Sequence, residues 1–180
     1  MNIAETSLPG VLLLTPNIYR DDRGAFWETW NYNRIAEAGL PSNWVQDNFS
    51  ISKKNVIRGI HYQLMHPQGK LVRVVAGEIF DVAVDLRKSS PTFGRWHGVH
   101  LSGENKQMLW IPPGLAHGFS VISDGAHVIY KATDFYHPEL ERTLLWNDSD
   151  LNIDWELKGL PILSAKDKQG LSFQSAEKFD

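Results

Sequence analysis

The middle of the chain carries apolar side chains at every second position. From Phe80 to Leu86, Phe, Val and Leu alternate with Asp and Ala, so one face of this segment is apolar. A Val-rich stretch from Lys70 to Ala76 precedes it and ends at Gly77-Glu78, which is typical of a hairpin turn. Further apolar stretches follow at spacings of about ten residues, at 96–101, 107–111, 117–122 and 126–132. Short strands at this spacing favour an all-β sandwich or barrel over alternating strands and helices.

Helical signals are few. A short helix is predicted over 33–38, capped by Asn31 or Asn33 and stopped by Gly39 and Pro41. A second short turn is predicted from Ser164 to Lys168. The chain shows no internal repeat, low-complexity tract or linker, and its 180 residues suit one domain. We therefore expect a single all-β domain over residues 1–180 with a few short helices.

Composition narrows the class of protein. Hydrophobic residues make up 42% and charged residues 22%, as in ordinary soluble globular domains. A net charge of −3 disfavours general nucleic-acid binding. With no cysteine, the chain has no disulfide, thiolate metal site or Cys nucleophile. The early apolar run from Val11 to Leu14 is too short for a signal peptide or a membrane helix. We expect a cytoplasmic protein that binds neither nucleic acid nor membrane.

Two acidic residues lie on the second face of the strand predicted over 80–86. Asp81 and Asp85 alternate with its apolar positions, so a sandwich or barrel would enclose them. Enclosed carboxylates need hydrogen-bonding or charged partners, or a function. The alternative is that this face is simply solvated.

Two of the seven histidines stand in distinctive surroundings. His61 lies in Arg58-Gly59-Ile60-His61-Tyr62-Gln63, and His117 ends a Pro-x-Gly-x-x-His sequence that resembles the second motif of cupin barrels, which are jelly rolls. The His-x-His that metal-binding cupins carry in their first motif is missing, because His61 is followed by Tyr-Gln. His61, His117 and a carboxylate could still form a two-histidine metal site. Both histidines could equally be packed and hydrogen-bonded in the core.

Four cations surround these motifs in the sequence: Arg23, Arg58, Lys70 and Lys166. Arginine forks suit phosphate oxygens. The chain has no glycine-rich phosphate loop, so any phosphate would be bound by side chains. By spacing alone, we expect these four scattered cations to be solvated surface residues.

A series of longer motifs runs in order along nearly the whole chain. They are Asp22-Arg23-Gly24-x-Phe26-x-Glu28, Gln46-Asp47-Asn48-x-Ser50, the segment 58–63, Gln68-Gly69-Lys70-Leu71-Val72-Arg73-Val74, the segment 81–87, Ser90-Pro91-Thr92-Phe93-Gly94, Ala116-His117-Gly118-Phe119, Trp146-Asn147-Asp148 and Leu163-Ser164-x-Lys166-Asp167. Together they resemble the dTDP-4-dehydrorhamnose 3,5-epimerase family of the cupin superfamily. The resemblance implies a homodimeric jelly roll that works without metal or cofactor on a dTDP-4-keto-6-deoxy sugar.

The resemblance also implies roles for individual residues. His61 matches the family's proton acceptor, Tyr130 its proton donor, Asp167 the carboxylate that pairs with the histidine, and Lys70 the lysine near the sugar ketone. Tyr136 matches an aromatic residue that stacks on the thymine. The other matched positions contact the substrate: Arg23, Glu28, Gln46, Asp47, Asn48, Arg58, His117, Glu141 and Lys166.

The implied reaction inverts carbons 3 and 5 of dTDP-4-dehydro-6-deoxy-D-glucose and gives dTDP-4-dehydro-L-rhamnose. Removing a proton next to a ketone requires a base with a pKa near neutrality, which imidazole supplies, and a cation at the ketone oxygen. One alternative is a single-centre epimerase or ketoisomerase of a related dTDP-4-keto sugar. Another is a non-catalytic sugar-nucleotide or metal-binding cupin, which the joint presence of an acid and a base disfavours.

Overall fold

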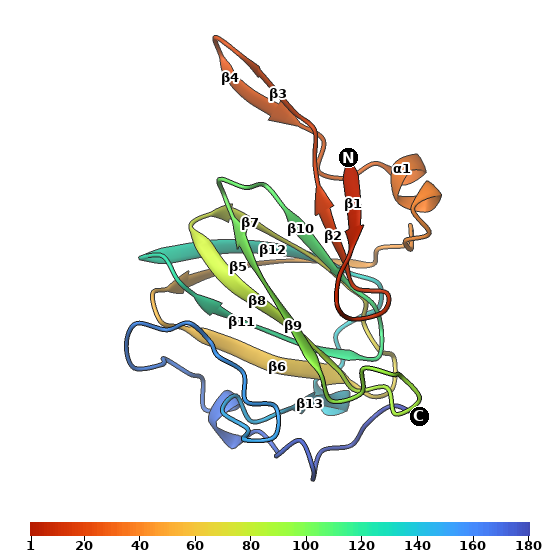
Figure 1. Cartoon of the computed structure of the whole chain (residues 1–180), viewed down its shortest axis with the longest axis vertical. Coiled ribbons are helices and arrows are strands. Elements are labelled where there is room, and N and C mark those ends of the chain that lie inside the picture. The colour runs from red at the N-terminus through yellow and green to blue at the C-terminus, as the bar shows by residue number, and fades with distance from the viewer.

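Two antiparallel sheets form the body of the protein in the computed structural model, which describes all 180 residues (Figure 1). The six-stranded sheet has the order β1 (Asn2–Glu5), β2 (Leu12–Thr15), β10 (Met108–Ile111), β7 (Lys70–Ala76), β12 (Gly125–Ala132) and β5 (Gln46–Lys53). The five-stranded sheet has the order β13 (Glu141–Thr143), β6 (Ile57–Gln63), β11 (Leu115–Val121), β8 (Glu78–Asp85) and β9 (Trp96–Ser102). The all-β architecture expected from the alternation is confirmed.

The helices are short. The α-helix α1 (Tyr32–Glu37) begins one residue earlier than expected, because the Asn31 side chain accepts hydrogen bonds from the backbone N–H groups of Asn33 and Arg34. The 3-10 helices are η1 (Pro138–Leu140) and η2 (Asp167–Gln169), and η2 overlaps the turn predicted from the sequence. No helix has the length and apolar character needed to cross a membrane.

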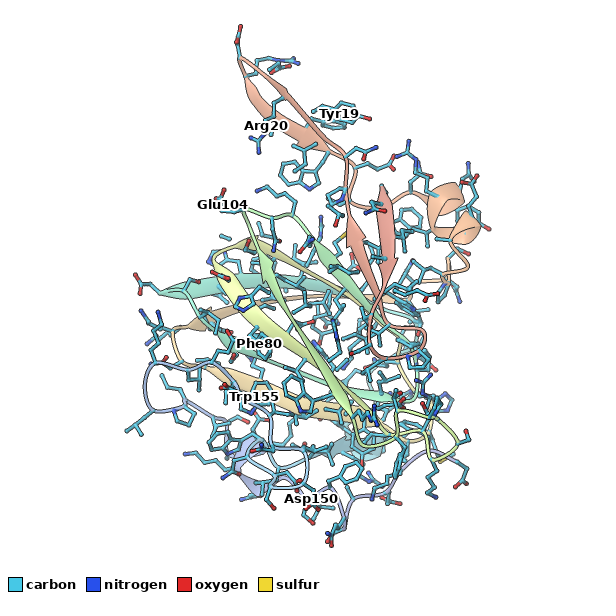
Figure 2. All side chains as sticks on the ribbon, in the orientation of Figure 1. Tyr19, Arg20, Phe80, Glu104, Asp150 and Trp155 are labelled. Carbon is cyan, nitrogen blue, oxygen red and sulfur yellow. The ribbon has the colours of Figure 1, made fainter.

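A separate hairpin extends from the body. Its strands β3 (Ile18–Asp21) and β4 (Gly24–Trp27) pair only with each other, and Figure 1 shows them projecting beyond the two sheets. Tyr19 and Phe26 are direct neighbours across the hairpin and are 61% and 71% exposed. Figure 2 shows Tyr19 and Arg20 well apart from the side chains that fill the body. Two large aromatic side chains are therefore left uncovered on this hairpin.

Strand β8 is buried on both faces. Phe80 and Val82 pack against the C-terminal segment, in one apolar cluster with Trp155. On the other face, Asp81 and Asp85 are completely buried between the two sheets. The prediction that a sandwich encloses both carboxylates is confirmed, and the alternative of a solvated face is wrong.

Each of these carboxylates has hydrogen-bonding partners. Asp85 accepts hydrogen bonds from the side chains of Arg87, Ser90 and Thr92. Burial opposes ionisation of Asp85, but these hydrogen bonds outweigh burial and lower its pKa to about 2. Asp81 is hydrogen-bonded to a histidine of the neighbouring strand, His117. Asp85 therefore ties a turn to the barrel wall, whereas Asp81 holds a histidine side chain.

Strands β6 and β11 approach each other unusually closely at two glycines. Gly59 has φ +124°, and a Cβ atom there would lie 2.4 Å from the Cα of Gly118. The strand register is irregular at this point, since His117 pairs with His61 while Phe119 pairs with Arg58. Two steps along β11 thus match three steps along β6, which is a β-bulge. Because of the bulge, Arg58 and His61 line the same cavity although three positions separate them.

Candidate active site

A cavity of about 530 Å³ lies between the two sheets. The six-stranded sheet contributes side chains from β5, β7 and β12, and the five-stranded sheet contributes side chains from β6, β11 and β13. The remaining residues come from loops and the start of η2. The cavity is lined by Gln46, Asn48, Ser50, Arg58, His61, Gln68, Lys70, His117, Phe119, Tyr130, Tyr136, Glu141, Ser164, Lys166 and Asp167. Almost all the lining is polar or charged, as a site for a charged, hydroxylated ligand requires.

His61 and Asp167 form a hydrogen-bonded pair in this cavity. The Nε2 atom of His61 lies 2.6 Å from an Asp167 carboxylate oxygen, and Asp167 is only 3% exposed. Burial opposes ionisation of Asp167, but the hydrogen bond and charge of His61 and a hydrogen bond with Ser164 lower its pKa below the ordinary value. The carboxylate therefore stays ionised, holds one ring nitrogen of His61 and leaves the other available to accept a proton.

Lys70 brings a half-buried amine to the cavity at the first position of β7. Burial lowers its pKa to about 8, while the negative charges of Glu141 and Asp81 act against this shift. Its Nζ atom lies 5.9 Å from the centre of the Tyr130 ring and forms no ion pair. At neutral pH most of the Lys70 side chains are still charged and free to donate hydrogen bonds to a ligand.

Tyr130 lies on the wall of the cavity that faces His61. It belongs to β12 of the six-stranded sheet, whereas His61 belongs to β6 of the five-stranded sheet. Burial raises the pKa of Tyr130, and the negative charge of Glu141 raises it further. The phenol is therefore protonated at neutral pH. A carboxylate-bound histidine and a protonated phenol thus line opposite walls of one cavity.

A network centred on Glu141 connects several cavity residues. Its carboxylate accepts hydrogen bonds from Lys166 Nζ at 2.6 Å and from the Tyr136 hydroxyl at 2.9 Å, and lies 3.8 Å from His61 Nδ1. Burial opposes the ionisation of Glu141, but the hydrogen bond from Lys166 and the other neighbours lower its pKa. The ionised carboxylate fixes the ring of Tyr136, which is 45% exposed. Tyr136 therefore offers an aromatic face to a ligand.

His117 is held by Asp81 at 2.7 Å between side-chain atoms. The second Asp81 oxygen is buried and has no hydrogen-bond partner. His61 and His117 are direct neighbours across β6 and β11, and each is bound to its own carboxylate. The two histidines are thus both packed and hydrogen-bonded, and both line the cavity.

Three residues matched by the resemblance do not line the cavity of their own chain. Arg23 lies at the hairpin turn, where it bonds Asp21 with a side chain 90% exposed. Glu28 pairs with Arg34 at 3.2 Å. Asp47 points to the opposite side of β5 from its neighbours and bonds Lys131 at 3.0 Å. The other matched residues all line this cavity.

Other residues line the cavity without having been predicted to do so. They are Ser50, Gln68, Phe119 and Ser164. Strand alternation could have placed two of them on the cavity face, because Ser50 continues the alternation of β5 and Phe119 lies two positions after His117. Gln68 and Ser164 lie in loops, where the period of two that holds in strands does not predict the direction of a side chain.

Comparison with known proteins assigns the family. A family model described as dTDP-4-dehydrorhamnose 3,5-epimerase matches residues 5–175. The chain belongs to this family. It is 52% identical over 180 residues to the dTDP-4-dehydrorhamnose 3,5-epimerase of Pseudomonas aeruginosa, and the match covers 99% of each chain. The 3,5-epimerase is thus an isomerase, as the resemblance implied.

Solved structures of epimerases share this fold. The Legionella pneumophila 3,5-epimerase, solved in complex with dTDP-4-keto-L-rhamnose, superposes with a TM-score of 0.95 at 50% identity, over 98% of this chain and 94% of that one. A 3′-monoepimerase from Streptomyces bikiniensis, in complex with dTDP-quinovose, has a TM-score of 0.90 at 32% identity, over 95% of this chain and 87% of that one. The cupin-like jelly roll is confirmed, and the 3,5-epimerases support inversion at both sugar carbons.

Proposed function

We propose that His61, Tyr130, Asp167 and Lys70 carry out the proton transfers of this 3,5-epimerase on a dTDP-4-keto-6-deoxy sugar. The observation that supports this assignment is the hydrogen-bonded pair of His61 and Asp167, with Tyr130 on the opposite wall of the same cavity. Inversion of a carbon needs a proton removed from one face and returned to the other. A base and an acid on facing sheets have the placement that this requires.

In the first step, the free ring nitrogen of His61 removes the proton beside the ketone. The C–H electron pair moves into the carbon skeleton, and the ketone oxygen gains negative charge as the enolate forms. Asp167 stabilises the imidazolium that results. The Lys70 ammonium donates a hydrogen bond to the enolate oxygen, where one preorganised donor is typically worth about 3–4 kcal/mol.

In the second step, the Tyr130 hydroxyl protonates the same carbon on its other face. The enolate electron pair takes this proton, the ketone re-forms, and a tyrosinate remains until it gains a proton. The His61 imidazolium loses its proton to restore the base. The same pair of steps at the other carbon completes the 3,5-inversion. No electron is gained or lost overall, so the reaction needs no redox cofactor.

The other cavity residues bind and orient the nucleotide sugar in this proposal. Tyr136 stacks on the thymine through the half-exposed face that Glu141 fixes. Gln46 accepts a hydrogen bond from the Tyr136 backbone N–H and donates one to Asn48, so these two amides are preorganised. Arg58 supplies a guanidinium for the diphosphate, which holds the sugar in place for proton transfer. His117 and Lys166 complete the polar lining.

We also propose a homodimer in which the β3–β4 hairpin of each copy reaches the cavity of the other. Arg23 and Glu28 match substrate-binding positions, but neither lines the cavity of its own chain. The hairpin that carries Arg23 projects from the body and exposes Tyr19 and Phe26. A second copy would cover these aromatic rings and receive the arginine. Exposed apolar side chains on a projecting element are typical of such contacts.

The proposed compartment is the cytoplasm. A chain without cysteine folds without disulfides and loses nothing in a reducing environment. No metal or other cofactor is assigned to the proton transfers, because side chains of the cavity supply the base, the acid and the cation. The proposed partners are therefore the dTDP-sugar and a second copy of the chain.

Isotope exchange tests the proposed function. The protein is incubated with dTDP-4-keto-6-deoxyglucose in heavy water, and deuterium at carbons 3 and 5 is followed by NMR. Deuterium at both carbons with formation of dTDP-4-keto-L-rhamnose is the expected result. Deuterium at carbon 3 alone would instead indicate a single-centre epimerase. Absence of exchange at both carbons would contradict the assignment of the base.

A further inference from the structure

Three potential metal ligands converge outside the catalytic cavity. They are His66, in the loop between β6 and β7, and Asp134 and His137, in the segment after β12. One ligand atom from each side chain lies within 4.8 Å of the others. None of the three residues lines the catalytic cavity. We propose that His66, Asp134 and His137 form a binding site for a divalent transition-metal ion such as Zn²⁺.

The ligand set fits this class of ion. Imidazole and carboxylate ligands suit Zn²⁺ and its first-row neighbours, and three protein ligands leave one position for water. Bonds of about 2.1 Å place tetrahedral ligand atoms roughly 3.4 Å apart. His66 Nδ1 and an Asp134 carboxylate oxygen already lie 3.3 Å apart. The ring of His137 lies 5.1 Å from that of His66 between centroids, and its ligand atom lies within 4.8 Å of those of the other two residues.

The buried amide of Gln63 holds the two loops in this arrangement. Gln63 is 3% exposed, and its Nε2 atom donates to the backbone carbonyls of His66 at 2.8 Å and Phe135 at 3.2 Å. Its Oε1 atom accepts from the backbone N–H of His137 at 2.8 Å. One side chain from the barrel therefore fixes the backbone of His66, of His137 and of Phe135, the residue that follows Asp134. Such a preorganised site loses little conformational entropy when it takes up an ion.

The surroundings also orient the individual ligands. A Glu139 carboxylate oxygen lies 3.4 Å from His137 Nδ1, as in sites where a ligating histidine donates its other ring N–H to a carboxylate. One Asp134 oxygen accepts a hydrogen bond from the backbone N–H of Phe135 at 2.8 Å. That bond leaves the other oxygen, the one near His66, for the metal. The bound ion would cross-link the 64–67 loop to the 133–137 segment.

Calorimetry with Zn²⁺ tests the site. The untagged full-length chain is stripped with a chelator, dialysed and titrated with zinc chloride. We expect one ion per chain and a higher thermal midpoint in its presence. His66→Ala and His137→Ala should each weaken binding at least tenfold, since even loss of a partner outside the ligand shell costs about 10–100-fold. Asp134→Asn keeps the shape of the side chain and should weaken binding as well.

A matched control separates this site from incidental histidine binding. His127 packs against Phe49 on another part of the molecule, so His127→Ala should bind Zn²⁺ as the parent chain does. The thermal midpoint of each variant without metal reports whether it is folded, and the isosteric Asp134→Asn variant covers any loss of folding in the histidine variants. Absence of Zn²⁺ binding by the parent chain would overturn the proposal. So would binding that His66→Ala, His137→Ala and Asp134→Asn all leave unchanged.

Discussion

His61 and Lys70 show how neighbouring groups adapt ordinary side chains to the reaction. The imidazole of His61 is fixed at 2.6 Å by a carboxylate that is ionised and almost fully buried. The amine of Lys70 has a pKa of about 8, because burial disfavours its charged form. At neutral pH the Lys70 amine remains mostly charged, and it has no ion-pair partner that would compete with the substrate. In the proposed mechanism, these two groups are the base and the cation that enolate formation requires.

Base and acid variants should fail in different ways. His61→Asn removes the base, so deuterium exchange and inversion should both fall by at least about 10²–10⁴-fold. Tyr130→Phe keeps the base and Lys70, so the enolate should still form and take a proton back from the imidazolium on the original face. NMR in heavy water should then show deuterium in the substrate with little inverted product.

Full inversion by Tyr130→Phe would remove Tyr130 from the mechanism. Exchange by His61→Asn at the parent rate would contradict the assignment of the base. Thermal unfolding of both variants serves as the control, because Tyr130 is partly buried against the core and its hydroxyl could contribute to stability instead.

Replacing Lys70 should separate activity from stability. Lys70→Met removes the cation at the enolate oxygen and should lower kcat by about 10²–10³-fold. The thermal midpoint at pH 7 should be unchanged or higher, because an apolar side chain avoids the desolvation of a buried ammonium. Lys54→Met, at a surface ion pair with Asp124, is the control and should retain the parent kcat. A Lys70→Met variant with parent activity would contradict the role of the amine.

The same lysine gives activity and stability opposite responses to pH. Activity should fall as pH rises through about 8, because the ammonium form is lost. Between about 8 and the ordinary value of 10.5, the unfolded chain binds more protons at Lys70 than the folded chain does. The contribution of Lys70 to the free energy of unfolding should therefore rise with pH over this window. Both trends should be absent in Lys70→Met.

Among the elements, β6 and β11 carry the geometry of the cavity. Their close contact at Gly59 and Gly118 allows a bulge, and the bulge directs both Arg58 and His61 into one cavity. Without it, residues three positions apart on a strand would point to opposite faces. Two glycines without reactive side chains therefore decide where His61 lies.

A methyl group at Gly59 should disturb this crossing. Gly59→Ala places a Cβ against the β11 backbone and should destabilise the protein by about 1–3 kcal/mol, with a lower kcat because Arg58 and His61 shift. Gly39→Ala, which also has a positive φ of +72° but open space around it, isolates the cost of backbone strain and should retain activity. Denaturant unfolding and kcat of both variants provide the comparison. Equal effects of the two substitutions would contradict the argument.

For the molecule as a whole, we propose that a second copy of the chain covers the projecting hairpin. Arg23 at its turn is 90% exposed, and the cavity of the same chain does not contain it. In the proposed dimer, each active site combines the base of one copy with the arginine of the other. A site shared in this way depends on assembly for its activity.

Mixing two inactive variants tests the shared site. Arg23→Ala and His61→Asn should each be nearly inactive alone. In a mixed dimer, the cavity that keeps His61 receives the intact Arg23, so an equimolar mixture that exchanges subunits should regain about a quarter of the parent rate. Sedimentation should show a dimer in every sample. A mixture that exchanges subunits without regaining activity would indicate that Arg23 acts within its own chain.

Much of the architecture could be predicted from local pattern. The alternation over 80–86 and the turn residues around it predicted strands and an all-β sandwich or barrel, because side-chain direction in a strand has a period of two. Asn31 predicted the start of the helix, since capping depends on groups a few residues apart. The longer motifs identified the family and the residues that the cavity assembles, among them His61, Lys70 and Tyr130.

Other features required the tertiary structure. Alternation separates the two faces of β8 but does not show what covers each, so only the packed sheets decided that Asp81 is enclosed beside His117. The lowered pKa of Lys70 arises from burial by segments distant in the sequence. Asp167 lies 106 residues from His61, and no local pattern relates them. Period and turn chemistry act over a few residues, whereas burial, charge and contact depend on which distant segments meet.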